Sequence, residues 1–116
     1  MRHEVTPADT ALAVGSGDVE VLATPRLLTW LEYTTAQLAS RVLEPGQTSV
    51  GTAVRIRHRL PTRVGDTVDT VADEPAVDGR KLLFQVRATN SAGQLIADGE
   101  LERVVVDRAR FLANVP

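Results

Sequence analysis

The chain has 116 residues, of which 43% are hydrophobic and 24% are charged, and its formal net charge is −2. This length fits one domain spanning 1–116, and the apolar fraction is too high for an intrinsically disordered chain. A near-neutral charge argues against nucleic acid as the main partner, and no apolar run is long enough to cross a membrane. Without cysteine there is neither a disulfide nor thiolate chemistry, and two histidines far apart in the sequence make a poor zinc site. With no apolar N-terminal leader, these exclusions predict a small globular protein of the cytoplasm.

The first half of the chain predicts two short strands and one long helix. The strands are expected at His3–Thr6 and Val19–Leu22, and the helix at Thr24 to about Leu43. Thr24 as N-cap and Pro25 at the first helical position signal the helix start, and Pro45 signals its end. One apolar stripe recurs at helical spacing, so the helix is expected to pack on one face only: Leu27, Leu31, Thr35, Leu38 and Val42.

The second half of the chain predicts strands separated by turns. Alternating runs occur at Ser49–Leu60, Asp66–Ala76, Lys81–Asn90 and Gln94–Val106, the second being the weakest. The pair Asp78-Gly79 is a hairpin signal, and Arg108–Asn114 predicts a short closing helix. The expected fold is α+β, with one helix on an antiparallel meander. One helix cannot cover both faces of such a sheet, so its uncovered face and edge favour a homodimer.

Two residues break the apolar pattern of their elements. Glu32 falls at the margin of the helix stripe, where a carboxylate is partly desolvated; a solvated glutamate at the stripe edge is the commoner interpretation of this position alone. In the run Ser49–Leu60, alternation places His58 on the apolar face, and it places Gly51 with the arginines at 55, 57 and 59 on the other. An inward histidine near a strand end suits general acid/base chemistry, although a core histidine held by a hydrogen bond is the commoner interpretation of this position alone.

Three more positions have both a structural and a functional interpretation. Helix capping is enough to explain Thr24. A glycine inside a strand, such as Gly51, marks a bulge or the close approach of a ligand. Arg103 lies an even number of residues from Leu95, Leu101 and Val105 in the same predicted strand, so their side chains share a face. Arg103 is therefore expected to point inward and to need an acidic partner or a bound anion. The arginine stripe at 55, 57 and 59 fits a solvated face or a phosphate-bearing substrate tail.

The chain resembles the hotdog-fold thioesterases, and within them the fluoroacetyl-CoA thioesterase-like family. The resemblance covers about Val19 to Phe111, and its most specific stretch is LEPGQTSVGTAVRIRH at Leu43–His58, preceded by an acidic residue midway along the helix. The later stretch VDGRKLLFQVRATNSAGQLIADGELERVVVDRARF also resembles the closing strands and terminal helix of that family. The resemblance implies one long helix wrapped by an antiparallel sheet, in a dimer with the acyl pocket at the subunit interface.

The resemblance also implies hydrolysis of an acyl-CoA thioester to the free acid and CoA. No cofactor is expected, and CoA enters as part of the substrate. Thr24, Glu32 and His58 match the catalytic positions of the family, with Glu32 as nucleophile or as the base that activates water. His58 is then the acid/base, and Thr24 positions the carboxylate or the carbonyl. Gly51 and Arg103 are the predicted substrate-binding residues, the backbone amide of Gly51 polarising the thioester carbonyl.

The resemblance leaves the substrate open. A phenylalanine-bearing segment precedes the helix in the fluoroacetate-specific enzyme, whereas the four aromatic residues here all follow Thr24, so fluoroacetyl selectivity is not expected. The alternative function is a non-catalytic hotdog module that binds an acyl-CoA or a small acid. A hydratase is disfavoured because Ala53 stands where hydratases of this fold carry an aspartate. The hydrolase hypothesis requires Glu32 and His58 to converge in one pocket, within a protomer or across a dimer.

Overall fold

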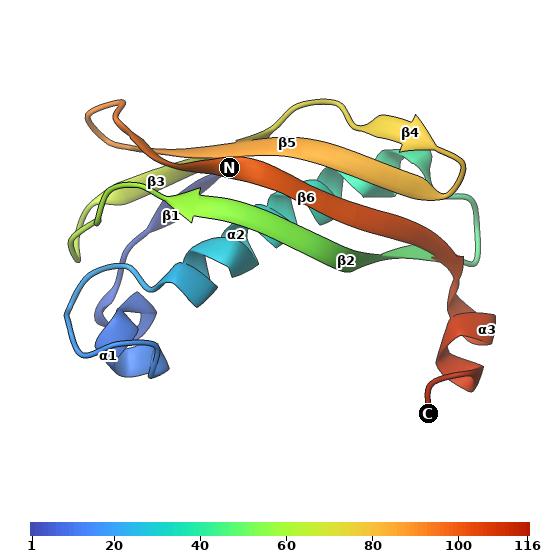
Figure 1. Ribbon diagram of the computed structural model, residues 1–116, viewed down its shortest axis with the longest axis horizontal. Helices are drawn as coiled ribbons and strands as arrows, with labels where there is room; N and C mark the ends of the chain where they lie inside the picture. Colours follow the sequence, from blue (N-terminus) through green and yellow to red (C-terminus); the bar gives the residue numbers. More distant parts are fainter.

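In a computed structural model that describes residues 1–116, an antiparallel sheet curls around one long helix (Figure 1). The helices are α1 (Ala11–Val14), α2 (Thr24–Ala39) and α3 (Arg108–Ala113), with 3-10 turns at Pro7–Asp9 and Ser40–Val42. The strands are β1 (Arg2–Glu4), β2 (Gln47–His58), β3 (Thr67–Ala72), β4 (Ala76–Asp78), β5 (Lys81–Asn90) and β6 (Leu95–Asp107). None of the helices is long and apolar enough to cross a membrane.

The strand order is β1-β3-β5-β6-β2, and β4 pairs with β5. The four longer strands therefore do not form the simple meander that the sequence predicts, because β2 crosses to the far edge and pairs with β6. Those two strands are the longest in the sheet, with 12 and 13 residues, whereas β3 has only six. Pairing β2 with β6 satisfies far more backbone groups than pairing it with its chain neighbour β3. The consequence for the site is that β2 is an edge strand.

The long helix ends earlier than predicted. α2 stops at Ala39, and the chain tightens into the 3-10 turn before Pro45. A 3-10 turn has three residues per turn rather than 3.6, so Val42 rotates off the apolar stripe and is 56% exposed. The helix instead buries Leu27 and Leu31, which pack in one cluster with side chains of the sheet such as Phe84. The burial of these leucines fixes which face of the helix is turned toward β2.

The N-terminal segment also departs from the prediction. The expected strand at Val19–Leu22 is reduced to two isolated bridges, Thr10 with Leu22 and Val21 with Arg63. The unpredicted helix α1 precedes it, capped by the side chain of Thr10, which accepts a hydrogen bond from the Ala13 amide at 3.2 Å. The hairpin at Asp78-Gly79 is confirmed: Asp78 pairs with Lys81 across a tight turn.

Candidate active site

A β-bulge in β2 decides which of its side chains face the helix. Gly51 pairs with Arg103 and Ala53 with Glu102, so Thr52 has no ladder partner of its own. Directly paired residues share a face of the sheet, so Gly51 lies on the inner face with the buried Arg103. The continuous alternation predicted for Ser49–Leu60 is therefore wrong before the bulge, where it placed Gly51 with the arginines. After the bulge it is right, because His58 is half-buried while residues 55, 57 and 59 are exposed.

Glu32 and Arg103 form an ion pair beneath the bulge. Glu32 Oε2 lies 3.5 Å from Arg103 Nη1, and the side chains are 46% and 9% exposed respectively. Arg103 donates from Nε to Ser49 Oγ at 2.9 Å and from Nη2 to the Ser49 carbonyl at 3.0 Å. All three guanidinium nitrogens thus have partners, and the acidic partner that the sequence required is Glu32. The arrangement holds one carboxylate oxygen in a fixed place on the inner face.

Burial acts on Arg103 in the expected direction. Desolvation lowers the pKa of the Arg103 guanidinium, and the charge of Glu32 opposes this shift. An arginine starts from so high a pKa that it stays protonated in spite of burial. The pair is therefore a carboxylate beside a permanent cation.

Gly51 lies against the same carboxylate. A Cβ built at this position would lie 2.7 Å from Glu32 Oε2 and 3.8 Å from Arg103 Nη1. The backbone of Gly51 does not have a positive φ, so it would itself accept a side chain. A side chain here would displace the carboxylate, and glycine is therefore the residue that allows Glu32 to approach the backbone of β2.

Thr24 and His58 form a second polar pair at the far end of β2. Thr24 Oγ1 lies 2.7 Å from His58 Nδ1. Thr24 is the first residue of α2 and not its N-cap, which is Ala23, and no side chain caps this end. The predicted capping role is wrong because the hydroxyl is engaged by the imidazole. Pro25 accordingly occupies the second helical position, not the first.

The free ring nitrogen of His58 is buried and has no hydrogen-bond partner. Burial lowers the pKa of His58 below its ordinary 6.5, and the neighbouring Leu60 backbone opposes this shift only in part. The imidazole is consequently neutral at neutral pH, with Nδ1 occupied by Thr24. In either tautomer Nε2 is the nitrogen that remains for a ligand, as an acid/base requires.

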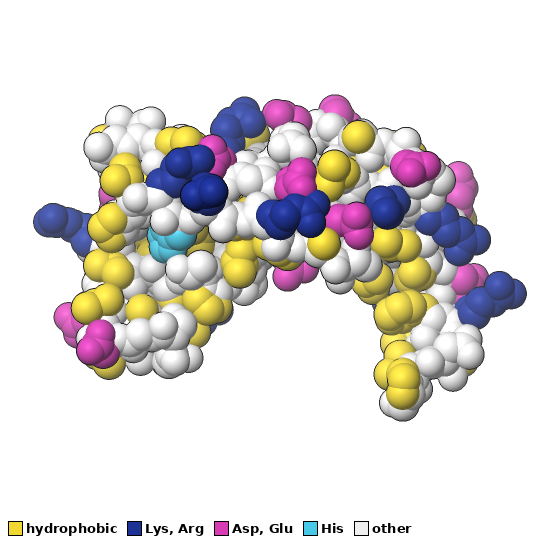
Figure 2. Space-filling model, in the orientation of Figure 1, with side chains coloured by type: hydrophobic (Ala, Val, Ile, Leu, Met, Phe, Trp, Pro, Cys, Tyr) yellow, Lys and Arg dark blue, Asp and Glu magenta, His cyan; other side chains and the backbone are white.

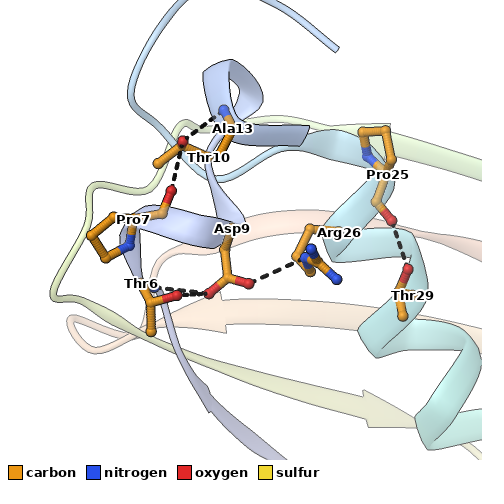
Figure 3. Close-up of polar contacts among 8 residues, drawn as sticks. All are labelled: Thr6, Pro7, Asp9, Thr10, Ala13, Pro25, Arg26 and Thr29. Atoms are coloured by element: carbon orange, nitrogen blue, oxygen red, sulfur yellow. Dashed lines mark hydrogen bonds and ion pairs between the residues drawn. The ribbon is translucent and has the colours of Figure 1, made fainter. Parts of the chain in front are cut away.

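A pocket of about 370 Å³ opens at this pair, between the N-terminal segment, the start of α2 and the end of β2. One wall comes from the segment around α1, which an ion pair anchors to the helix: Asp9 Oδ1 lies 3.1 Å from Arg26 Nε (Figure 3). The second carboxylate oxygen of Asp9 accepts from the Thr6 amide and hydroxyl, both at 2.8 Å. The wall is therefore tied to the same helix that carries Thr24.

Within one protomer the two pairs stay apart. Thr24 and Glu32 are eight residues apart on α2, which is about 12 Å along the helix. Gly51 and His58 are separated along β2 by about 20 Å, allowing for the bulge. The structure thus brings Thr24 to His58, and Glu32 to Gly51 and Arg103, but it does not bring Glu32 to His58 in a single chain. Sequence reasoning missed Ser49, whose role depends on strand register, and the only signal for it was its parity with Gly51.

The helix wrapped by an antiparallel sheet is the hotdog fold, as in a hot-dog-like protein from Thermanaerovibrio acidaminovorans with a TM-score of 0.87 at 24% identity, covering 97% of this chain and 83% of that one. The chain matches the family of fluoroacetyl-CoA-specific thioesterases over residues 5–109. It is 34% identical to the fluoroacetyl-CoA thioesterase of Streptantibioticus cattleyicolor over 96 residues, which are 83% of this chain and 68% of the relative.

Solved structures agree with this family. The fluoroacetyl-CoA thioesterase FlK has a TM-score of 0.90 at 28% identity, covering 100% of this chain and 93% of that chain. A variant of FlK in complex with fluoroacetate and CoA has a TM-score of 0.89 at 29% identity, covering 97% and 92%. The chain belongs to the fluoroacetyl-CoA-specific thioesterase family and is a thioester hydrolase by that membership. The family and the hotdog fold predicted from the sequence are confirmed.

Proposed function

We propose that this protein hydrolyses a short or small acyl-CoA thioester to the free acid and CoA, at a site completed across a homodimer. The observation that carries the proposal is the placement of two complementary half-sites at opposite ends of one edge strand. Thr24 and His58 supply an acid/base with a free buried nitrogen, and Glu32 supplies a carboxylate held by Arg103. The half-site at Thr24 and His58 has no carboxylate of its own, and the half-site at Glu32 and Arg103 has no imidazole.

A two-fold axis through the exposed edge of β2 joins these halves. When two copies of β2 pair antiparallel, residues equidistant from the axis come together, and the midpoint of Gly51 and His58 lies between residues 54 and 55. That midpoint is close to the middle of β2, which spans Gln47–His58. Glu32 of one protomer then faces Thr24 and His58 of its partner. The pairing also covers a long unpaired strand edge, which proteins rarely leave open.

The outline of the molecule supports the same pairing. α1 and α3 project from opposite ends of β2, so the surface below the strand is hollowed between two arms (Figures 1 and 2). Large apolar side chains are exposed on both arms: Leu12 and Val14 on α1, Phe111 and Leu112 on α3. An antiparallel pair of protomers would place the α3 arm of one beside the α1 arm of the other. Exposed apolar surface of this kind marks an interface.

The proposed chemistry divides between the two halves. Glu32 either attacks the thioester carbonyl or takes a proton from the attacking water, while the carbonyl oxygen accepts from the backbone N–H of Gly51. The neutral His58 first takes a proton at Nε2, either from the water that hydrolyses the acyl-Glu32 anhydride or from Glu32 once that carboxylate has deprotonated the attacking water. The imidazolium then gives this proton to the thiolate of CoA, and Thr24 fixes the ring through Nδ1. Arg103 acts as a positioning residue, since its nitrogens are taken by Ser49 and Glu32. The pocket at Thr24 has room for a small acyl group.

The test is thiol release from a panel of acyl-CoAs of increasing chain length. We expect His58→Ala to lower turnover by roughly 10²–10⁴-fold, the usual contribution of a positioned acid/base, with the fold intact by circular dichroism. His3→Ala is the matched control, because that histidine lies on β1, stacked on Trp30 and not in the pocket. Equal rates for the wild type and His58→Ala would overturn the proposal. Thermal stabilisation by acyl-CoAs without thiol release would favour a binding module.

A further inference from the structure

A second, larger hollow lies on the outer face of the sheet, on the other side of β2 from the half-buried His58. Its volume is about 780 Å³, within the range of small-molecule sites. Strands β2, β5 and β6 form it, and four arginines and one aspartate line it: Arg55, Arg57, Arg59, Arg87 and Asp98. We call this hollow the arginine groove. In Figure 2 a group of Lys and Arg side chains lies over this part of the sheet, beside a histidine.

One positive charge in the arginine groove is not compensated. Arg55 pairs with Glu100, Arg59 with Asp98 at 2.8 Å and Arg87 with Asp73 at 3.1 Å. Arg57 has no carboxylate within 4.0 Å, although Asp98 is its direct cross-strand partner. Asp98 is taken by Arg59 instead. Arg57 is therefore the arginine of the groove whose charge is free to pair with a bound anion.

The arginine groove adjoins the pocket at Thr24 and His58 at one shared residue. Arg59 lines both the groove and the pocket, and it directly follows His58, the last residue of β2. A ligand with its reacting group at His58 can therefore pass over this strand end and place its other end on the outer face. That ligand must be elongated and must carry negative charge at the end away from the reacting group.

We propose that the arginine groove binds the phosphate groups of the CoA tail, with Arg57 as the principal contact. This inference rests on the proposed thioesterase function. The planar guanidinium binds two phosphate oxygens at once, and its unpaired state means that no ion pair has to be broken first. The flanking arginines at 55 and 59 are held in place by their own carboxylates, which keeps the groove open and its field positive. The thioester end then lies on the inner face and the nucleotide end on the outer face.

The experiment compares substrates with and without phosphates. Michaelis constants are measured for acetyl-CoA and for S-acetylpantetheine, which lacks all phosphate groups, in the wild type and Arg57→Ala. We expect the variant to raise KM for acetyl-CoA by roughly 5- to 20-fold, the loss of one charge-assisted contact, with kcat and the values for S-acetylpantetheine unchanged. Arg2→Ala is the matched control, since that arginine is exposed and pairs with Asp69 on β3, away from the groove. Acetyl-dephospho-CoA assigns the contact to the 3′-phosphate if Arg57→Ala leaves its KM unchanged, and to the pyrophosphate if KM still rises.

Calorimetric titration with CoA itself separates this inference from the proposed function. If the protein hydrolyses no thioester, the proposed function fails, yet CoA should still bind more tightly than pantetheine, and Arg57→Ala should remove the difference. An unchanged KM and CoA affinity in Arg57→Ala would overturn the groove assignment. So would an equal loss for S-acetylpantetheine, which would mean that the substitution disturbs the inner face rather than a phosphate contact.

Discussion

The proposed dimer, with two half-sites on β2, predicts that activity can be rebuilt from two inactive chains. Glu32→Gln removes the carboxylate from both sites of a homodimer, and His58→Ala removes the imidazole from both. In a mixed dimer one site combines the native Glu32 of one chain with the native His58 of the other, while the second site lacks both. Random mixing of equal amounts makes about half of the dimers mixed, with one working site of two, so about one quarter of wild-type activity should return.

This recovery is large against the background. Each parent is expected to keep about 1% of wild-type activity or less, so the mixture should exceed either parent by about 25-fold or more. Thiol release is measured after the two chains are co-refolded, with light scattering to verify that dimers form. Mixing His58→Ala with Thr24→Ala is the matched control, because both substitutions damage the same half-site and no intact site can form. Activity equal to the parental mean, in a mixture shown to be dimeric, would refute the site shared across the dimer. The prediction of a shared site depends on the distance of about 12 Å between Thr24 and Glu32 along one helix, which keeps the two groups apart within a chain.

Three further predictions concern the same groups. Gly51→Ala places a Cβ 2.7 Å from Glu32 Oε2 and should shift the carboxylate. We expect kcat to fall by about 10²-fold while the melting temperature stays within a few degrees of the wild type. In the Glu32→Gln background the same substitution should have no further effect on kcat. Burial lowers the pKa of His58, so the rising limb of the kcat/KM profile should have its midpoint below 6.5, and a midpoint above 6.5 would contradict the neutral imidazole. The unfolded chain takes up this proton near pH 6.5, whereas the folded chain takes it up only at lower pH. Chemical denaturation should therefore show that the free energy of unfolding decreases as pH falls below 6.5. His3 acts in the same direction, because burial also lowers its pKa.

Much of the fold could be predicted because local patterns decide it. Alternation located β5 at Lys81–Asn90 without error, and the helix start at Thr24 followed from Pro25 and the apolar stripe. The inward direction of His58 could also be predicted, since the regular part of β2 after the bulge keeps period two. These features depend on residues within one or two turns of each other, where sequence and structure are directly linked.

The pairing of strands could not be predicted in the same way. Alternation says which residues share a face of a strand, but it does not say which strand lies beside it. The placement of β2 against β6 depends on the summed hydrogen bonds of two segments separated by some 40 residues, and it is this pairing that leaves β2 at the edge. The bulge at Thr52 is equally non-local, because it exists only relative to the register of the partner strand.

The sequence by itself therefore determined the residue types of the candidate site and the elements that carry them: a carboxylate on the helix, an imidazole and a glycine on one strand, and an arginine on another. Only the tertiary structure decided how these groups combine. It turned Gly51 inward through a bulge, gave Glu32 its cation in Arg103 and gave His58 its partner in Thr24. The physical reason is that the chemistry of each side chain depends on its own residue alone, whereas the distance between two functional groups depends on long-range packing to which many residues contribute.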